Sequence, residues 1–185
     1  MILPQSHTLT TRHLNRVFDN TVATYKYYWF LGILDACVKQ GKSRINVWDI
    51  MISMVANAWY PVNYFRLSFG KSESLYDAIL TLQREYNIPI NIGINELTEL
   101  LQTLIQRREV RRLLNFLQMN VPFRFLRPWI DTSDDKQMVL RSQTFENGCL
   151  YKLERIDQIW WIELNPTWLP YLRENYDILT SFAYW

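Results

Sequence analysis

Apolar side chains recur at steps of three and four residues along most of the chain, a spacing typical of helices with one buried face. The helices that it predicts begin near Arg12 and then cover about 22–40, 47–59, 72–86, 95–105 and 107–117. The one over 22–40 is apolar nearly all round, which indicates that other helices surround it. Pro61 is expected to end the helix that begins at Val47, because proline lacks the N–H of a helix interior. The pattern therefore predicts a mainly α fold, a multi-helix bundle.

The apolar stripe changes side near Gln106. At 100° per residue, the arginines that follow this position would fall on the same side as the leucines that precede it, and the new apolar stripe begins at Val110. Either the helix breaks near Gln106, or one continuous helix leaves one packing partner and meets another.

The last third of the chain has a different pattern. A turn-forming acidic stretch, Asp131 to Asp135, predicts a boundary between a helical body, residues 1–130, and a smaller α+β appendage, residues 131–185, with the two packed as one unit. Within the appendage, β-favouring residues predict a hairpin at about 150–164. Asn165 and Pro166 can then start a helix over about 166–185.

Composition and charge narrow the class of protein. With 185 residues, 49% of them hydrophobic and only 21% charged, the chain can close one substantial core and is not disordered. Two distant cysteines indicate no disulfide framework, and no secretory signal is recognisable. The longest uncharged run, Ile50 to Phe65, is too polar to span a membrane. We therefore expect a cytoplasmic protein without membrane contact.

Catalytic patterns are missing from the sequence. The two histidines, His7 and His13, do not have the spacing of a helical metal site, and the glycines form neither a phosphate loop nor a nucleophile elbow. Cys37 lies in the most apolar helix, where a thiol stays protonated. No catalytic residue, metal or cofactor is therefore assigned to this chain.

The pattern that stands out is a stripe of arginines. Residues 107–127 carry six basic side chains and one acidic one, while residues 131–185 carry five and nine. The six basic side chains are Arg107, Arg108, Arg111, Arg112, Arg124 and Arg127. Guanidinium groups suit the geometry of phosphate oxygens, which predicts contact with a nucleic-acid backbone. Two alternatives stay open: these arginines pair with the acidic residues between Asp131 and Asp177, or they bind another protein.

Aromatic residues near the C-terminus suggest a second function. Trp160 and Trp161 are neighbours on a predicted strand, so they point to opposite faces and one of them can face a partner. The aromatic ending at Trp185 has the composition of a helix interior, which predicts that the chain is cut from a longer protein or buries its end against another chain. These residues favour a protein–protein interaction or dimerisation module with no nucleic-acid contact.

Three stretches of the chain also resemble a known family. They are TTRHLNRVFDNTVATYKYYWFLGILD at 10–35, VPFRFLRPW at 121–129 and NPTWLPYLRENYDILTSFAYW at 165–185. In this order they resemble the N-terminal region of bacterial, Bacteroidetes-type HNH endonuclease domain-containing proteins. The resemblance implies a helical accessory domain that helps to recognise DNA or to assemble the nuclease.

The catalytic part of that family cannot be carried onto this chain. In the family, a ββα-metal module follows this region, and its histidines activate water and help to hold a divalent metal. This sequence has no histidine after His13, so the metal would belong to a module outside it. The sequence thus predicts a non-catalytic accessory domain, whose partners are DNA, a nuclease module or a second copy of itself.

Overall fold

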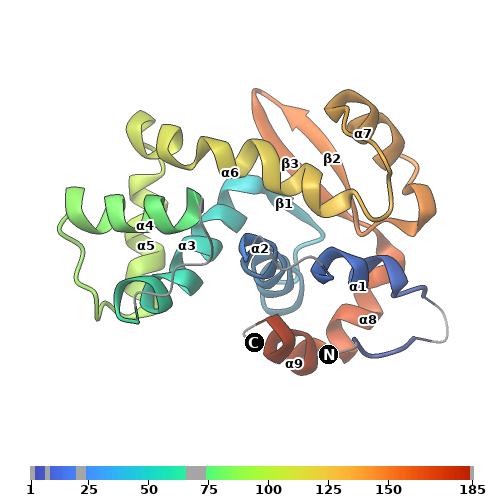
Figure 1. Cartoon of the computed structure of the whole chain (residues 1–185), viewed down its shortest axis with the longest axis horizontal. Coiled ribbons are helices and arrows are strands. Elements are labelled where there is room, and N and C mark those ends of the chain that lie inside the picture. Colours follow the sequence, from blue (N-terminus) through green and yellow to red (C-terminus); the bar gives the residue numbers. More distant parts are fainter. Residues whose placement is uncertain (1–2, 7–8, 20–23, 66–73, 184–185) are drawn as a thin grey trace.

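Helices make up most of the computed structural model, which describes residues 3–6, 9–19, 24–65 and 74–183 (Figure 1). The helices are α1 (Arg12–Phe18), α2 (Tyr25–Leu34), α3 (Val47–Asn63), α4 (Ser74–Glu85), α5 (Ile94–Leu104), α6 (Arg108–Leu126), α7 (Asp135–Ser142), α8 (Leu169–Glu174) and α9 (Tyr176–Ala183). The strands are β1 (Arg44–Asn46), β2 (Tyr151–Ile156) and β3 (Ile159–Leu164). The predicted mainly α fold with a small C-terminal hairpin followed by helix is confirmed.

Helix α2 is the centre of the helical packing. It contacts α1, α3, α6 and α9, and Figure 1 shows it almost end-on with α6 crossing above it and α9 below. Trp29 of α2 is fully buried, and its Nε1 donates to the hydroxyl of Tyr151, 3.2 Å away. That hydroxyl donates in turn to the carbonyl of Pro122 at 2.6 Å. One buried hydrogen-bonded chain therefore joins α2, β2 and α6.

The sheet has a strand that the sequence did not predict. Its order is β1-β3-β2, all antiparallel, and β1 comes from the helical part of the chain. Ile162 of β3 lies opposite Ile45 on one side and Leu153 on the other, and all three side chains are buried. Because β1 is only three residues long, its alternation is too short to show in the sequence.

The outer edge of β2 is covered by the end of α7. The N–H of Leu153 donates to Ser142 Oγ at 3.1 Å, and its carbonyl accepts from Gln143 Nε2 at 2.7 Å. These side chains occupy backbone groups that would otherwise be open to pairing with another strand.

Proline does not end α3, contrary to the sequence prediction. Pro61 lies inside the last turn of this helix, which continues to Asn63. A proline so close to the end removes one helical hydrogen bond, whereas continuing the helix buries Val62 completely. Pro122 lies in the same way inside α6, four residues before its end.

The predicted single helix over 166–185 is broken. A 3₁₀ turn at Pro166–Trp168 comes first, capped by Asn165, whose Oδ1 accepts from the N–H of Thr167 at 3.1 Å. Asn175 then leaves the helical conformation between α8 and α9, at φ −107° and ψ 15°.

The proposed boundary at Asp131 falls in a loop before α7, and several sets of contacts between elements cross it. Strand β1 pairs with β3, and α9 packs against α2. In the described ranges, no helix combines the length and the apolar character that crossing a membrane requires.

Candidate nucleic-acid interface

The helix is interrupted at Gln106, as one of the two sequence alternatives predicted. Helix α5 ends at Leu104, and Arg107 is extended, at φ −78° and ψ 135°, before α6 begins at Arg108. Arg107 therefore does not lie on the helix with the other arginines. Its guanidinium is 5.4 Å from the centre of the Tyr86 ring.

Arg111 turns toward the end of α5. Its Nε donates to the carbonyl of Ile105 at 2.8 Å, and its Nη2 donates to Gln106 Oε1 at 3.3 Å. The same guanidinium lies 5.8 Å from the centre of the Trp48 ring. Arg111 thus satisfies a carbonyl that the end of a helix leaves open, which is a structural role.

Arg108 and Arg112 are exposed on the first turns of α6. Neither takes part in a salt bridge between described residues. Glu85 and Glu109 line a groove of about 320 Å³ together with Arg112 between α4 and α6. The start of α6 therefore carries two guanidinium groups without an ion-pair partner in the described structure.

A row of side chains at four-residue steps runs from this point along α6. Its members are Arg108, Arg112, Phe116, Asn120 and Arg124. Phe116 is 49% exposed although it is aromatic, and the guanidinium of Arg124 lies 5.7 Å from the centre of its ring. Asn120 donates from Nδ2 to the carbonyl of Phe116 at 2.8 Å. We call these five residues the α6 row.

A second group of cations lies at the far end of α6. Arg124 donates from Nη1 to the hydroxyl of Tyr25 at 3.3 Å, and the neighbouring Lys26 donates to the carbonyl of Val17 at 3.1 Å. Burial lowers the pKa of Lys26, and the positive charges of Arg127 and Arg124 lower it further. These three residues, Lys26, Arg124 and Arg127, form what we call the α2–α6 cluster.

Acidic residues of the C-terminal part form salt bridges with basic residues outside 107–127. Glu146 pairs with Arg141, Glu154 with Arg44 at 2.8 Å, and Glu163 with Lys152 at 3.2 Å. Among described residues, no salt bridge joins an acid of this part to any of the six arginines between 107 and 127. The alternative of pairing within the molecule therefore has no ion pair to support it.

The tryptophans expected to dock a partner lie in different environments. Trp160 is 9% exposed and packs edge-on against Phe123, with ring centres 5.1 Å apart, so it belongs to the core and not to a surface. Trp161 lies half-buried on the opposite face, with the guanidinium of Arg44 5.5 Å from its ring centre. The prediction for Trp185 lies outside the described residues.

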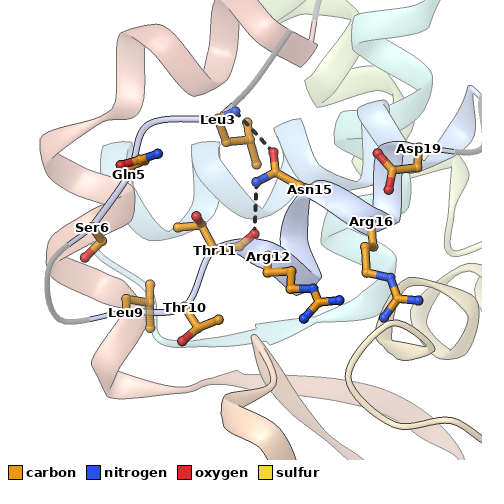
Figure 2. A pocket seen from close by; sticks show the side chains of 10 residues that line it. All are labelled: Leu3, Gln5, Ser6, Leu9, Thr10, Thr11, Arg12, Asn15, Arg16 and Asp19. Atoms are coloured by element: carbon orange, nitrogen blue, oxygen red, sulfur yellow. Dashed lines mark hydrogen bonds between the residues drawn. The ribbon is translucent and has the colours of Figure 1, made fainter.

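A hollow of about 680 Å³ beside α1 was not predicted (Figure 2). Asn15 stands in it, accepting from the N–H of Leu3 at 3.1 Å and donating to the carbonyl of Thr11 at 3.3 Å. Figure 2 shows Arg12 and Arg16 pointing to one side of the hollow. The side chain of Asn15 thus holds the N-terminal segment against α1.

Candidate metal ligands do not gather in the described structure, where no three His, Cys, Asp or Glu side chains are grouped as a site. His13 instead shares a hydrogen bond of 2.6 Å with the carbonyl of Pro128. His7 lies outside the described residues.

Three members of this interface, Phe116, Asn120 and Lys26, were missed in the sequence. Asn120 continues the four-residue steps from Phe116 to Arg124. Phe116 had a local signal, since it stands four residues after Arg112 and eight before Arg124 on one helix. Lys26 had none, because its place beside Arg124 depends on the packing of α2 against α6.

Comparisons of the chain with models of known protein families, with curated proteins and with solved structures found no match. The resemblance to HNH endonuclease-associated proteins therefore stays a prediction.

Proposed function

We propose that this chain is a non-catalytic domain that binds the phosphate backbone of nucleic acid along α6. The observation that carries the proposal is the set of guanidinium groups on this helix that have no salt-bridge partner in the described structure. Arg108 and Arg112 supply them at one end, and Arg124 and Arg127 at the other. Backbone phosphates would neutralise these charges without any reading of the base sequence.

The placement of the first two arginines supports an anionic ligand. A helix carries a partial positive charge at its start, so cations in the first turn are unfavourable there. Arg107 occupies the capping position of α6, and its side chain, which has donors only, cannot cap the open N–H groups of the helix. Arg108 in the first turn raises the positive potential at a site where backbone N–H groups are already open, and Arg112 adds to it from the second turn. Glu109 in the first turn lowers this potential in part, and a phosphate lowers it further.

The test is fluorescence anisotropy with a labelled mixed-sequence duplex and with one of its strands, over a series of salt concentrations. The log of affinity should fall linearly with the log of salt concentration for the wild type. In the double variant Arg108→Ala/Arg112→Ala the slope should flatten by about 1.4 for the single strand and about 1.8 for the duplex, because two phosphate contacts are lost.

A charge-matched control separates this site from a general effect of net charge. Lys136 on α7 and Arg173 on α8 are both exposed and lie outside α6. The variant Lys136→Ala/Arg173→Ala loses the same charge and should keep the wild-type slope. Absence of binding to both probes at low salt, or equal slopes for the two double variants, would refute the proposal.

We propose further that the domain is accessory to an HNH-type nuclease module. Support comes from the resemblance of the three stretches quoted above. The test is the coding sequence that follows the codon for Trp185: a reading frame that continues into a ββα unit with histidine and asparagine supports this context, and an immediate stop codon counts against it.

A further inference from the structure

We infer that the ligand of α6 is a single strand, DNA or RNA, and that Phe116 stacks against one of its bases. This inference rests on the proposed function and names the class of nucleic acid that the same surface takes.

The α6 row winds around its helix. Each four-residue step along a helix turns by about 40°, so the row winds by about 160° between Arg108 and Arg124 over a length of about 24 Å. A duplex is stiff over lengths far greater than this and stays straight beside the helix. It can therefore not contact both ends of the row, whereas a flexible single strand can follow its winding course.

Phe116 lies in the middle of the α6 row. Its phenyl ring is half-exposed among polar and basic side chains and contacts the guanidinium of Arg124, so the ring is available to a ligand. Proteins that hold single strands alternate cationic groups for the phosphates with aromatic rings on which bases stack. In a duplex the base faces are already stacked on one another, and the ring would have nothing to bind.

The contacts of Arg124 place a cation beside the aromatic ring of Phe116. Its guanidinium lies 5.7 Å from the centre of the Phe116 ring and is held by the hydroxyl of Tyr25 at 3.3 Å. Arg124 also belongs to the α2–α6 cluster with Lys26 and Arg127, where no salt bridge between described residues offsets the charge. A base on the ring thus has cations beside it for the phosphate that follows.

The carboxylates near the row lie toward its other end. Glu109 is the only acidic residue of α6, and it lines the groove between α4 and α6 with Glu85 and Arg112. These charges weaken a phosphate contact at Arg112 more than one at Arg124. We therefore expect the tighter half of the binding surface to run from Phe116 to Arg127.

The experiment compares three labelled probes of equal phosphate number at one salt concentration. They are a thymidine strand of about 15 nucleotides, within the range of site sizes of single-strand binding folds, a strand of the same length with abasic sugars, and a hairpin duplex. Wild-type protein should bind the thymidine strand at least about fivefold more tightly than the abasic strand, because stacking needs a base.

The decisive variant is Phe116→Leu. It should lose most of the preference for the thymidine strand and bind the abasic strand and the hairpin as the wild type does. Phe116→Trp should retain the preference. The matched control is Tyr60→Leu, which removes an aromatic ring of α3 that is 46% exposed, close to the 49% of Phe116, and circular dichroism confirms that each variant is folded.

The outcomes distinguish the two proposals. If the wild type binds all three probes with a salt slope but without preference for bases, or if Phe116→Leu binds the thymidine strand unchanged, the single-strand inference is wrong and backbone binding stands. If the wild type binds none of the probes at low salt, the proposed function itself fails.

Discussion

Replacing Arg111 by alanine should destabilise the protein, whereas replacing Arg108 should not. The two arginines lie one turn apart on α6 and look alike in the sequence. In the structure, Arg111 holds the carbonyl of Ile105 at 2.8 Å and lies over Trp48, while Arg108 is exposed. Arg111→Ala therefore removes a connection between the start of α6, the end of α5 and the start of α3.

The size of the effect follows from the contacts that are lost. A hydrogen bond from a charged donor contributes about 1.5–3 kcal/mol when it is buried, and the partial exposure of Arg111 reduces this to about 1 kcal/mol. The contact with the Trp48 ring adds about 0.5–1 kcal/mol. We expect a loss of about 1.5–2 kcal/mol in the free energy of unfolding, which lowers Tm by about 3–8 °C in a domain of this size. For Arg108→Ala the change should lie within about 0.5 kcal/mol, and the helix dipole favours a slight gain.

The assay is urea unfolding followed by tryptophan fluorescence. Equal slopes of the unfolding free energy against urea concentration would show that the unfolded states of the variants are comparable. Nucleic-acid affinity is measured on the same proteins. Arg108→Ala should lower nucleic-acid affinity and leave stability unchanged, whereas the main effect of Arg111→Ala should be a loss of stability. Equal stabilities for the two variants would show that the contacts of Arg111 with Ile105 and Trp48 are not structural.

Two further predictions concern the core. Tyr151→Phe leaves Trp29 Nε1 and the carbonyl of Pro122 without this buried partner, so the free energy of unfolding should fall by about 2–4 kcal/mol. A lower urea midpoint with an unchanged slope would show this fall, and a loss below about 1 kcal/mol would contradict it. Burial raises the pKa of Cys37 to about 11 and that of Cys149 to about 12, from 9.0. Both thiols thus keep their protons in the folded state at a pH where the unfolded chain loses them. Their contribution to stability should be constant below about pH 8 and fall above about pH 9, by up to about 1.4 kcal/mol per pH unit for each thiol. Urea midpoints across this range measure the fall, and a Cys37→Ala/Cys149→Ala variant, though less stable, should show a shallower one; identical pH dependence in both proteins would count against the assignment.

Local patterns predicted most of the helices, and they did so because each helix carries its own apolar stripe. The change of side at Gln106 is an example, since it can be seen from a few neighbouring residues and the structure has the break there. The hairpin was predictable for the same reason. Strand β1 was not, because three residues form a strand only through pairing with β3, far along the chain.

No local sequence pattern could predict which of the arginines have partners within the fold. Helical periodicity placed four of them together, but the roles of Arg107 and Arg111 depend on Tyr86 and Trp48, which come from other helices. The partners of Lys26 depend likewise on tertiary packing. Spacing can predict that charges share a face, whereas only the folded chain determines which of them are already occupied.

This distinction bears on why the remaining arginines are present. A cation at the start of a helix is unfavourable unless something offsets it, and for Arg107 and Arg111 the aromatic rings and the α5 carbonyl do so. Arg108 and Arg112 take part in no salt bridge or cation–π contact between described residues, and the acidic residues beside them are Glu109 of the same helix and Glu85 across the groove. A ligand that carries negative charge would offset the charge that these two carboxylates leave. If they serve the fold instead, substituting both should lower the free energy of unfolding while leaving nucleic-acid binding unchanged, which is the reverse of the behaviour expected here.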